Sequence, residues 1–323
     1  MRIASRVLIG IVLCASPASS SETAPAPHPM PDVEAQAKGL STAKDVPVAY
    51  DALMSWLGLS ACPSGECDKV LSVKWTDANL DADEADERVL AITTSGAGAC
   101  PSARVAVVVL DKTAKGWIAA ASTSLRIAGA TAPVAEVVAA QVHSAKVKDL
   151  VVRLDGRCDG GEREHELRVV TFEQGRLDEI ATSVDFVGKG LVAHAVSGAA
   201  PATIQLTDAK GKTQLWFDPS AYAYDALPPY EDAKKATVSK DDDDTLSTKE
   251  CAAPLSAAVA LECGLEGSAK VQVLVKQGKA IGATVAVTPA NPSFVRCMRK
   301  HVASASWPSL PGATGCVRTF AAK

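Results

Sequence analysis

Oxygen-bearing side chains recur at alternate positions of one short segment, and such a pattern can wrap a cation. They are Asp77, Asn79, Asp81, Asp83 and Asp86. Calcium takes six to eight oxygen ligands, which a loop supplies from successive alternate positions. The segment departs from a calcium hand twice: Ala82 stands where the loop turns on Gly, and Arg88 stands where a bidentate Glu closes it. A calcium site and a solvated acidic turn both fit, and the turn is the simpler interpretation.

A second group with chemical potential is Glu164-His165-Glu166, because a histidine beside carboxylates can act as an acid or a base. On a strand, however, His165 would face away from both glutamates. We found no zinc-protease spacing, nucleophile elbow or phosphate-binding loop in the chain. The absence of a catalytic constellation favours a non-enzymatic protein. A secreted hydrolase that uses Asp83, Asp86 or this patch is the alternative.

Charge and composition exclude one large class of partners. The 323 residues include 33 Lys and Arg against 37 Asp and Glu, a formal charge of -4. Nucleic-acid binding depends on clustered positive charge, so we expect no nucleic-acid partner. With 47% hydrophobic residues, the chain should fold rather than remain disordered.

The N-terminus has the pattern of an export signal. Arg2 and Arg6 precede an apolar run, and small residues follow up to Ser20. We predict a signal peptide over residues 1–20 and a periplasmic or secreted mature chain without a transmembrane segment. A lipoprotein anchored through Cys14 is the alternative, although Leu13 before it is larger than the residue usual at that position.

Eight cysteines outside the signal agree with export, because disulfides persist in oxidising compartments. Four lie in each half of the chain: Cys62, Cys67, Cys100 and Cys158, then Cys251, Cys263, Cys297 and Cys316. No two of them have the close spacing of zinc ligands. The even division predicts disulfides within each half.

Composition divides the mature chain into four parts. Alternate prolines predict an extended Pro/Ala-rich spacer over residues 21–45. Residues 46–225 carry short β-branched runs between turns, which predict a mainly β domain. Residues 226–250 carry two prolines and an acidic run, which indicate a linker. Residues 251–323 form a small C-terminal domain.

The β-rich domain contains a weak internal repeat. Residues 70–122 and 137–183 each read as successive strands with one cysteine in the same Gly-rich turn. If equivalent turns approach each other, Cys100 pairs with Cys158 and Cys62 pairs with Cys67. Four cysteines permit three pairings, so the other two connectivities stay open.

The C-terminal domain has the clearest pattern. A short helix precedes alternating Val and polar residues from Lys270 to Lys276, a turn at Gly278 and a returning strand. A helix after Asn291 then carries an apolar stripe, and a last strand ends at Phe320. The order helix, hairpin, helix, strand predicts an α+β fold.

These residues, with Trp307-Pro308 closing the second helix, resemble TonB C-terminal-like domains of bacterial envelope proteins. With Cys263 and Cys297, the pattern is similar to the C-terminal domain of AgmX/PglI-type gliding-motility proteins. We expect these two cysteines to pair, which leaves Cys251 with Cys316.

The resemblance implies a binding or assembly module that recruits an envelope protein by adding its strand to an exposed sheet edge. It implies no cofactor, and calcium would enter only through the acidic segment. The β domain is outside the resemblance, and a calcium-dependent surface adhesin remains a further alternative.

Overall fold

A computed structural model describes residues 26–322, except 84, 128–132, 159–162, 189, 238–245, 248–249, 252 and 310–311. The predicted signal peptide and Cys14 lie outside these residues. In the described part of the chain, no helix has the length and apolar character needed to span a membrane. The element order is mainly β, with antiparallel sheets throughout.

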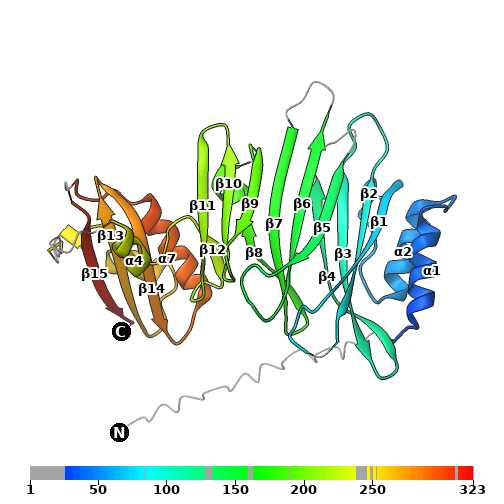
Figure 1. Ribbon diagram of the computed structural model, residues 1–323, viewed down its shortest axis with the longest axis horizontal. Helices are drawn as coiled ribbons and strands as arrows, with labels where there is room; N and C mark the ends of the chain where they lie inside the picture. The colour runs from blue at the N-terminus through cyan, green and yellow to red at the C-terminus, as the bar shows by residue number, and fades with distance from the viewer. Residues whose placement is uncertain are drawn as a thin grey trace, which may run out of the picture.

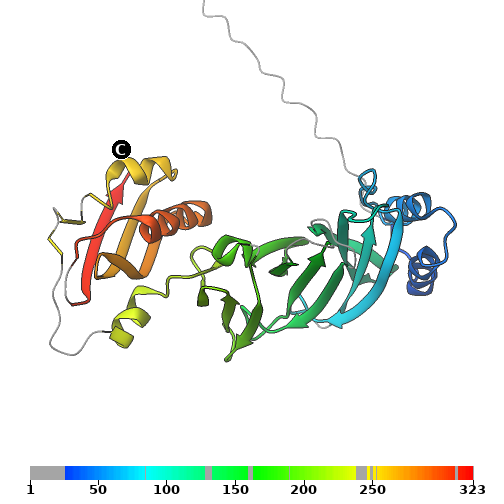
Figure 2. The same ribbon diagram turned by 90° about the horizontal axis from the view of Figure 1, so that it is seen from above.

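The molecule is a row of layers, which Figure 1 shows from the blue helices at one end to the red strand at the other. Two helices, α1 (Met30–Leu40) and α2 (Val46–Trp56), cover the first sheet. Two further sheets follow, and the C-terminal unit occupies the far end of the row. Figure 2 shows the same elongated shape from above.

The first two sheets are four-stranded meanders with the same order. One contains β1 (Lys69–Ala78), β2 (Glu87–Ser95), β3 (Ala103–Thr113) and β4 (Gly116–Ile127). The other contains β5 (Val134–Ala140), β6 (Asp149–Arg157), β7 (Arg163–Glu173) and β8 (Arg176–Thr182). This shared order agrees with the expected internal repeat.

Central strands of the first sheet are buried on both faces. Val105, Val107 and Val109 pack toward the second sheet, while Val108 and Leu110 pack against the helices. A strand buried on both faces needs apolar residues at every position, which explains the unbroken run in β3.

A smaller sheet, in the order β12-β11-β10-β9, covers the outer face of the second sheet. Its strands are β9 (Ala193–Ser197), β10 (Thr203–Asp208), β11 (Gly211–Asp218) and β12 (Ala223–Asp225), and the short helix α3 (Val184–Val187) precedes them. Ile204, Leu206 and Leu215 are buried against Leu167 and Val169.

The C-terminal unit has the predicted order of elements: α6 (Ala257–Glu262), β13 (Ser268–Lys276), β14 (Lys279–Thr288), α7 (Pro292–Ser304) and β15 (Thr314–Ala321). Its sheet has the order β14-β13-β15. Asn291 caps α7 by accepting a hydrogen bond from the backbone of Phe294. Phe294, Met298 and Val302 are fully buried, as the apolar stripe predicted.

The prediction of an extended spacer over residues 21–45 is wrong for its second half. Residues 30–40 form α1, whose Val33, Ala37 and Leu40 are buried in the core between the two N-terminal helices and the first sheet. Pro29 and Pro31 flank the helix start, where the missing backbone N–H of proline costs no helical hydrogen bond. Alternate prolines were therefore compatible with a helix.

The prediction of a linker over residues 226–250 is also wrong in its first half. Helix α4 (Tyr230–Thr237) packs on the C-terminal sheet, with Tyr230 and Ala233 buried against Leu274. Pro228 accepts a hydrogen bond from the backbone N–H of Ala283 in β14. This segment therefore belongs to the C-terminal unit, and the acidic run lies outside the described residues.

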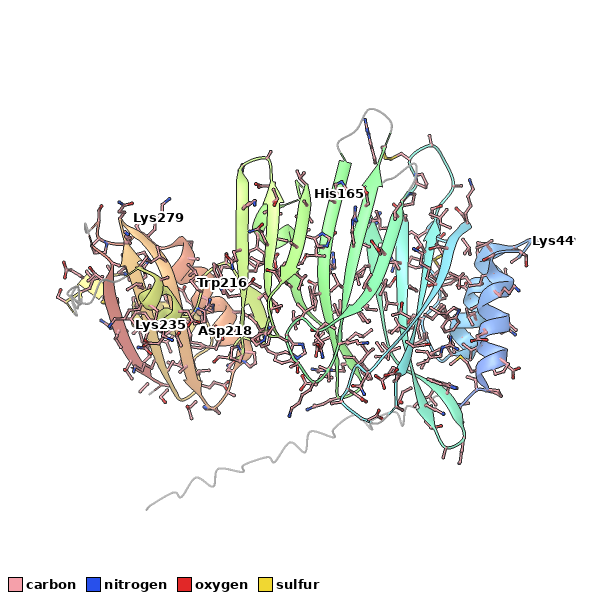
Figure 3. All side chains as sticks on the ribbon, in the orientation of Figure 1. Lys44, His165, Trp216, Asp218, Lys235 and Lys279 are labelled. Atoms are coloured by element: carbon pink, nitrogen blue, oxygen red, sulfur yellow. A yellow bond between two sulfur atoms is a disulfide. The ribbon has the colours of Figure 1, made fainter. Side chains whose placement is uncertain are left out.

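A buried arginine joins the C-terminal unit to the third sheet. Arg299 of α7 has a side chain that is 1% exposed, and its guanidinium lies 2.9 Å from Asp218 and 3.0 Å from Asp225. It also donates to the carbonyls of Leu227 and Ala283. Figure 3 labels Asp218 where the two parts meet. Residues 251–323 alone would leave this charge without its carboxylates.

Candidate functional site

All four predicted disulfides are present. They join Cys62 to Cys67, Cys100 to Cys158, Cys251 to Cys316 and Cys263 to Cys297, with Cα–Cα distances of 5.5–6.3 Å. The bridge between Cys100 and Cys158 connects equivalent turns of the two meanders, as the repeat predicted. Several disulfides are compatible with an oxidising, extracytoplasmic compartment.

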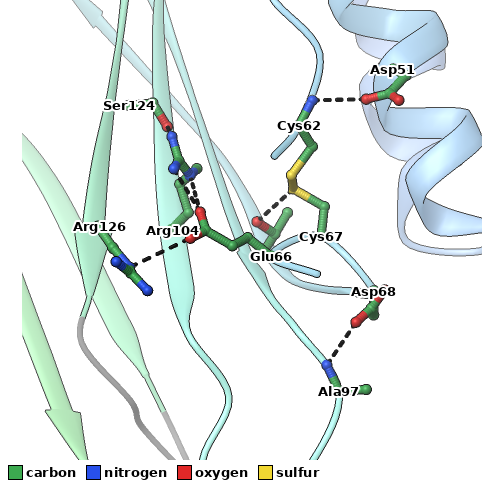
Figure 4. The surroundings of a disulfide bond; sticks show 10 residues. Asp51, Cys62, Glu66, Cys67, Asp68, Ala97, Arg104, Ser124 and Arg126 are labelled. Carbon is green, nitrogen blue, oxygen red and sulfur yellow. Dashed lines mark hydrogen bonds and ion pairs between the residues drawn. A yellow bond between two sulfur atoms is a disulfide. The ribbon is translucent and has the colours of Figure 1, made fainter. Parts of the chain in front are cut away.

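Polar contacts surround the Cys62–Cys67 bridge and fix its position (Figure 4). The Cys62 backbone donates to the Asp51 carboxylate of α2 at 2.8 Å. Glu66 pairs with Arg104 of β3 at 2.6 Å and with Arg126 of β4 at 3.4 Å. These contacts attach the segment before β1 to the first sheet, so the bridge has a structural role.

The acidic segment forms the loop between β1 and β2. Of the predicted ligands, only Asp81 and Asp83 lie close together there. One oxygen from each of Asp81, Asp83 and Glu87 lies within 4.8 Å of the other two. The Asn79 side chain instead closes the loop, accepting from the backbone of Ala82 at 3.0 Å and donating to the carbonyl of Asp83 at 2.6 Å.

Asp77 and Asp86 lie outside this group. Asp77 lies in β1 opposite Arg88, which binds its carboxylate at 2.9 Å and also contacts Glu34. Asp86 is exposed in the turn before β2. Ala82 takes a φ of 69°, the left-handed conformation for which a loop normally uses Gly. The missing Gly therefore did not prevent the turn.

Glu87, which the sequence pattern missed, is the unusual member. The residue is 0% exposed, and its Oε2 accepts a hydrogen bond from the Leu80 backbone at 2.5 Å. Its Oε1 has no hydrogen-bond partner among the described residues. Burial raises the pKa of Glu87 to about 7, and the nearby Asp81 and Asp83 add to the shift.

The carboxylate that lies near His165 comes from Asp155 of β6 and not from Glu166. His165 Nδ1 lies 3.6 Å from Asp155, whereas Glu166 binds Arg168 at 2.5 Å. His165 and Glu166 are neighbours on β7, so their side chains point to opposite faces. Figure 3 labels His165 toward one end of its sheet. The side chain of Glu164 lies outside the described residues.

A histidine–carboxylate pair that the sequence did not reveal lies between the second and third sheets. His143 Nδ1 is 2.6 Å from Asp149, which is fully buried, and its Nε2 is 3.4 Å from the Tyr222 hydroxyl. Burial raises the pKa of Tyr222 to about 12, so this hydroxyl stays protonated. Asp149 also accepts hydrogen bonds from the backbone N–H groups of Val142 and His143, so these contacts hold the connection between β5 and β6 in place.

An open cleft of about 1240 Å³ lies between β8, the third sheet and α7. Its lining mixes cations and anions, with Arg176, Arg296 and Lys300 beside Glu173, Asp178 and Glu179. The mixture indicates no particular class of ligand.

One lateral strand of the C-terminal sheet remains open along part of its length. The carbonyl of Gly315 points away from β13, because it accepts from the backbone of Leu246. The β13–β15 register has no bulge, so the backbone groups of Val317, Thr319 and Ala321 point the same way. Among the described residues, these groups have no hydrogen-bond partner.

The opposite lateral strand is different. In β14, the outward N–H of Ala283 donates to Pro228, and Thr284 accepts from the Tyr230 backbone. The chain itself therefore covers the centre of the β14 edge. Figures 1 and 2 both place β15 on the side of the sheet farthest from the N-terminal sheets.

No family model matches the chain, and the search of curated proteins returned no match.

Proposed function

We propose that the chain is an exported, non-enzymatic envelope protein that acts as a binding or assembly module, and that it contacts its partner through β15. The outward backbone groups of Val317, Thr319 and Ala321, which have no partner among the described residues, carry this proposal. An extended segment laid beside β15 would pair with these backbone groups, and its alternate side chains would contact the faces of the sheet.

Charge indicates the chemistry of the partner segment. Residues 226–323, which include the segment that packs on the C-terminal sheet, contain twelve Lys and Arg against nine Asp and Glu, a formal charge of +3, whereas the whole chain carries -4. Lys270 is exposed on β13 opposite Thr319 of β15, and Val317 is 46% exposed beside it. An extended segment with acidic side chains at alternate positions and small apolar residues between them complements this edge.

The sequence pattern of an export signal supports the assignment to the envelope. The predicted signal peptide and the four disulfides agree with folding in an oxidising compartment. The resemblance of residues 251–323 to TonB-type domains also supports strand addition as the mode of binding.

Val317→Pro tests the proposal with little damage to the fold. The Val317 N–H points outward, so proline there removes no hydrogen bond to β13, yet it blocks an added strand. The bait is the full chain, because Arg299 depends on Asp218 and Asp225. A displayed library of ten-residue peptides is selected on it, and enriched peptides are synthesised for titration.

We expect acidic, alternating peptides to be enriched and to bind Val317→Pro at least about tenfold more weakly, since each lost hydrogen bond is worth about 1 kcal/mol or more. Val317→Ala is the matched control, because it keeps the backbone N–H and should change Kd less than about threefold. Enriched peptides that bind the proline variant as tightly as the original chain would contradict strand addition at β15.

A further inference from the structure

We infer that the β1–β2 loop is a calcium site formed by Asp81, Asp83 and Glu87. These three carboxylates come from different points of one loop, and one oxygen of each lies within 4.8 Å of the others. Side-chain hydrogen bonds from Asn79 hold the loop in this shape. The inference is independent of the proposed role of β15.

The state of Glu87 is the second observation that points to a ligand. A side-chain oxygen at 0% exposure without a partner, here Oε1, is costly, because buried polar groups are normally hydrogen-bonded or coordinated. The neighbouring cation, Arg88, is already bound to Asp77 and Glu34 on the other side of the β1–β2 connection. A cation between the three carboxylates would supply the missing partner of Glu87.

The spacing and the donor set favour calcium over other metals. Two oxygens on one Ca²⁺, each at 2.3–2.6 Å, can lie up to about 5 Å apart, whereas the 2.0–2.1 Å bonds of Mg²⁺ allow only about 4 Å. The three oxygens lie within 4.8 Å of one another, inside the span that two Ca²⁺–O bonds can cover. All three donors are carboxylates, which does not suit zinc.

Exposure of the loop leaves room for the remaining ligands. Asp81 and Asp83 are exposed while Glu87 is buried, so the site opens to solvent on one side. Water would complete the six to eight oxygens that calcium takes. With three protein carboxylates on a solvent-facing loop, we expect a Kd for calcium on the order of 10⁻⁴ to 10⁻³ M, as in extracellular calcium-binding modules.

Calcium titration of the full chain, freed of metal with a chelator, tests the site. Calorimetry should show one binding event, and 10 mM CaCl₂ should raise the unfolding temperature by a few degrees, because calcium binds the folded state. Glu87→Gln, which keeps an acceptor for Leu80, and Asp81→Asn should each weaken binding at least tenfold. Asp86→Asn is the matched control from the same loop, and we expect its affinity to stay within twofold.

Three results would overturn the inference. The first is an original chain that gives neither heat nor a temperature shift with calcium. The second is unchanged affinity in both Glu87→Gln and Asp81→Asn, with folding confirmed by circular dichroism. The third is a binding heat and a temperature shift with MgCl₂ equal to those with CaCl₂, which would contradict a site that prefers calcium.

Discussion

Replacing Arg299 with methionine lowers the free energy of unfolding of the full chain by about 3–5 kcal/mol, the cost of removing one partner from a buried ion pair. Arg299 is 1% exposed and contacts two carboxylates and two carbonyls. Methionine fills similar volume but leaves Asp218 and Asp225 without their cation. Urea unfolding followed by circular dichroism measures the change.

Two further variants separate charge from packing. Arg296→Met alters the same helix, but Arg296 is exposed and donates one hydrogen bond, at 3.3 Å, to the Ala221 carbonyl, so we expect a change of about 0.5 kcal/mol. Adding Asp218→Asn and Asp225→Asn to Arg299→Met should restore about half of the lost free energy of unfolding, because it removes the two carboxylate charges that no longer have a cation beside them. A loss below about 1 kcal/mol for Arg299→Met would show that the two parts do not depend on this contact.

Removing the Cys100–Cys158 bridge by a double change to alanine should cost about 4 kcal/mol. The bridge closes a segment with a sequence separation of 58, and it connects the two meanders at their equivalent turns. Its main effect is to restrict the unfolded chain, and that restriction grows with the length of the closed loop. Denaturant unfolding of the oxidised protein measures the loss.

The Cys62–Cys67 bridge provides the internal comparison, since its sequence separation is only 5. Loop entropy predicts a cost of about 2 kcal/mol for its removal, roughly half that of the longer bridge. Equal losses for the two double variants would contradict the loop-length account.

Local patterns predicted much of this fold. Period-2 alternation marked β13, and the unbroken apolar run marked β3, because burial acts on each strand through its own residues. The repeat also gave the Cys100–Cys158 disulfide, since equivalent turns of stacked meanders lie close together, and this left Cys62 to pair with Cys67. The stripe of Phe294, Met298 and Val302 gave α7 for the same local reason.

Features set by tertiary contacts could not be predicted. Helix α4 has a charged sequence, and only its Tyr230 and Ala233 are buried, against a sheet that follows later in the chain. Arg299 meets residues more than 70 positions earlier, and no spacing rule connects them. Glu87 was missed because the calcium-hand pattern expects the closing carboxylate at position 88, whereas β2 begins one residue sooner.

Residue-resolved amide hydrogen exchange of the full chain tests the open β15 edge most directly. In the free protein, the amides of Val317 and Thr319 should exchange far faster than those of Arg318 and Phe320, whose N–H groups point toward β13. A saturating acidic peptide from the selection should slow Val317 and Thr319 at least tenfold and leave β14 unchanged. Slow exchange at Val317 and Thr319 in the free protein, or no added protection with peptide bound, would contradict the account.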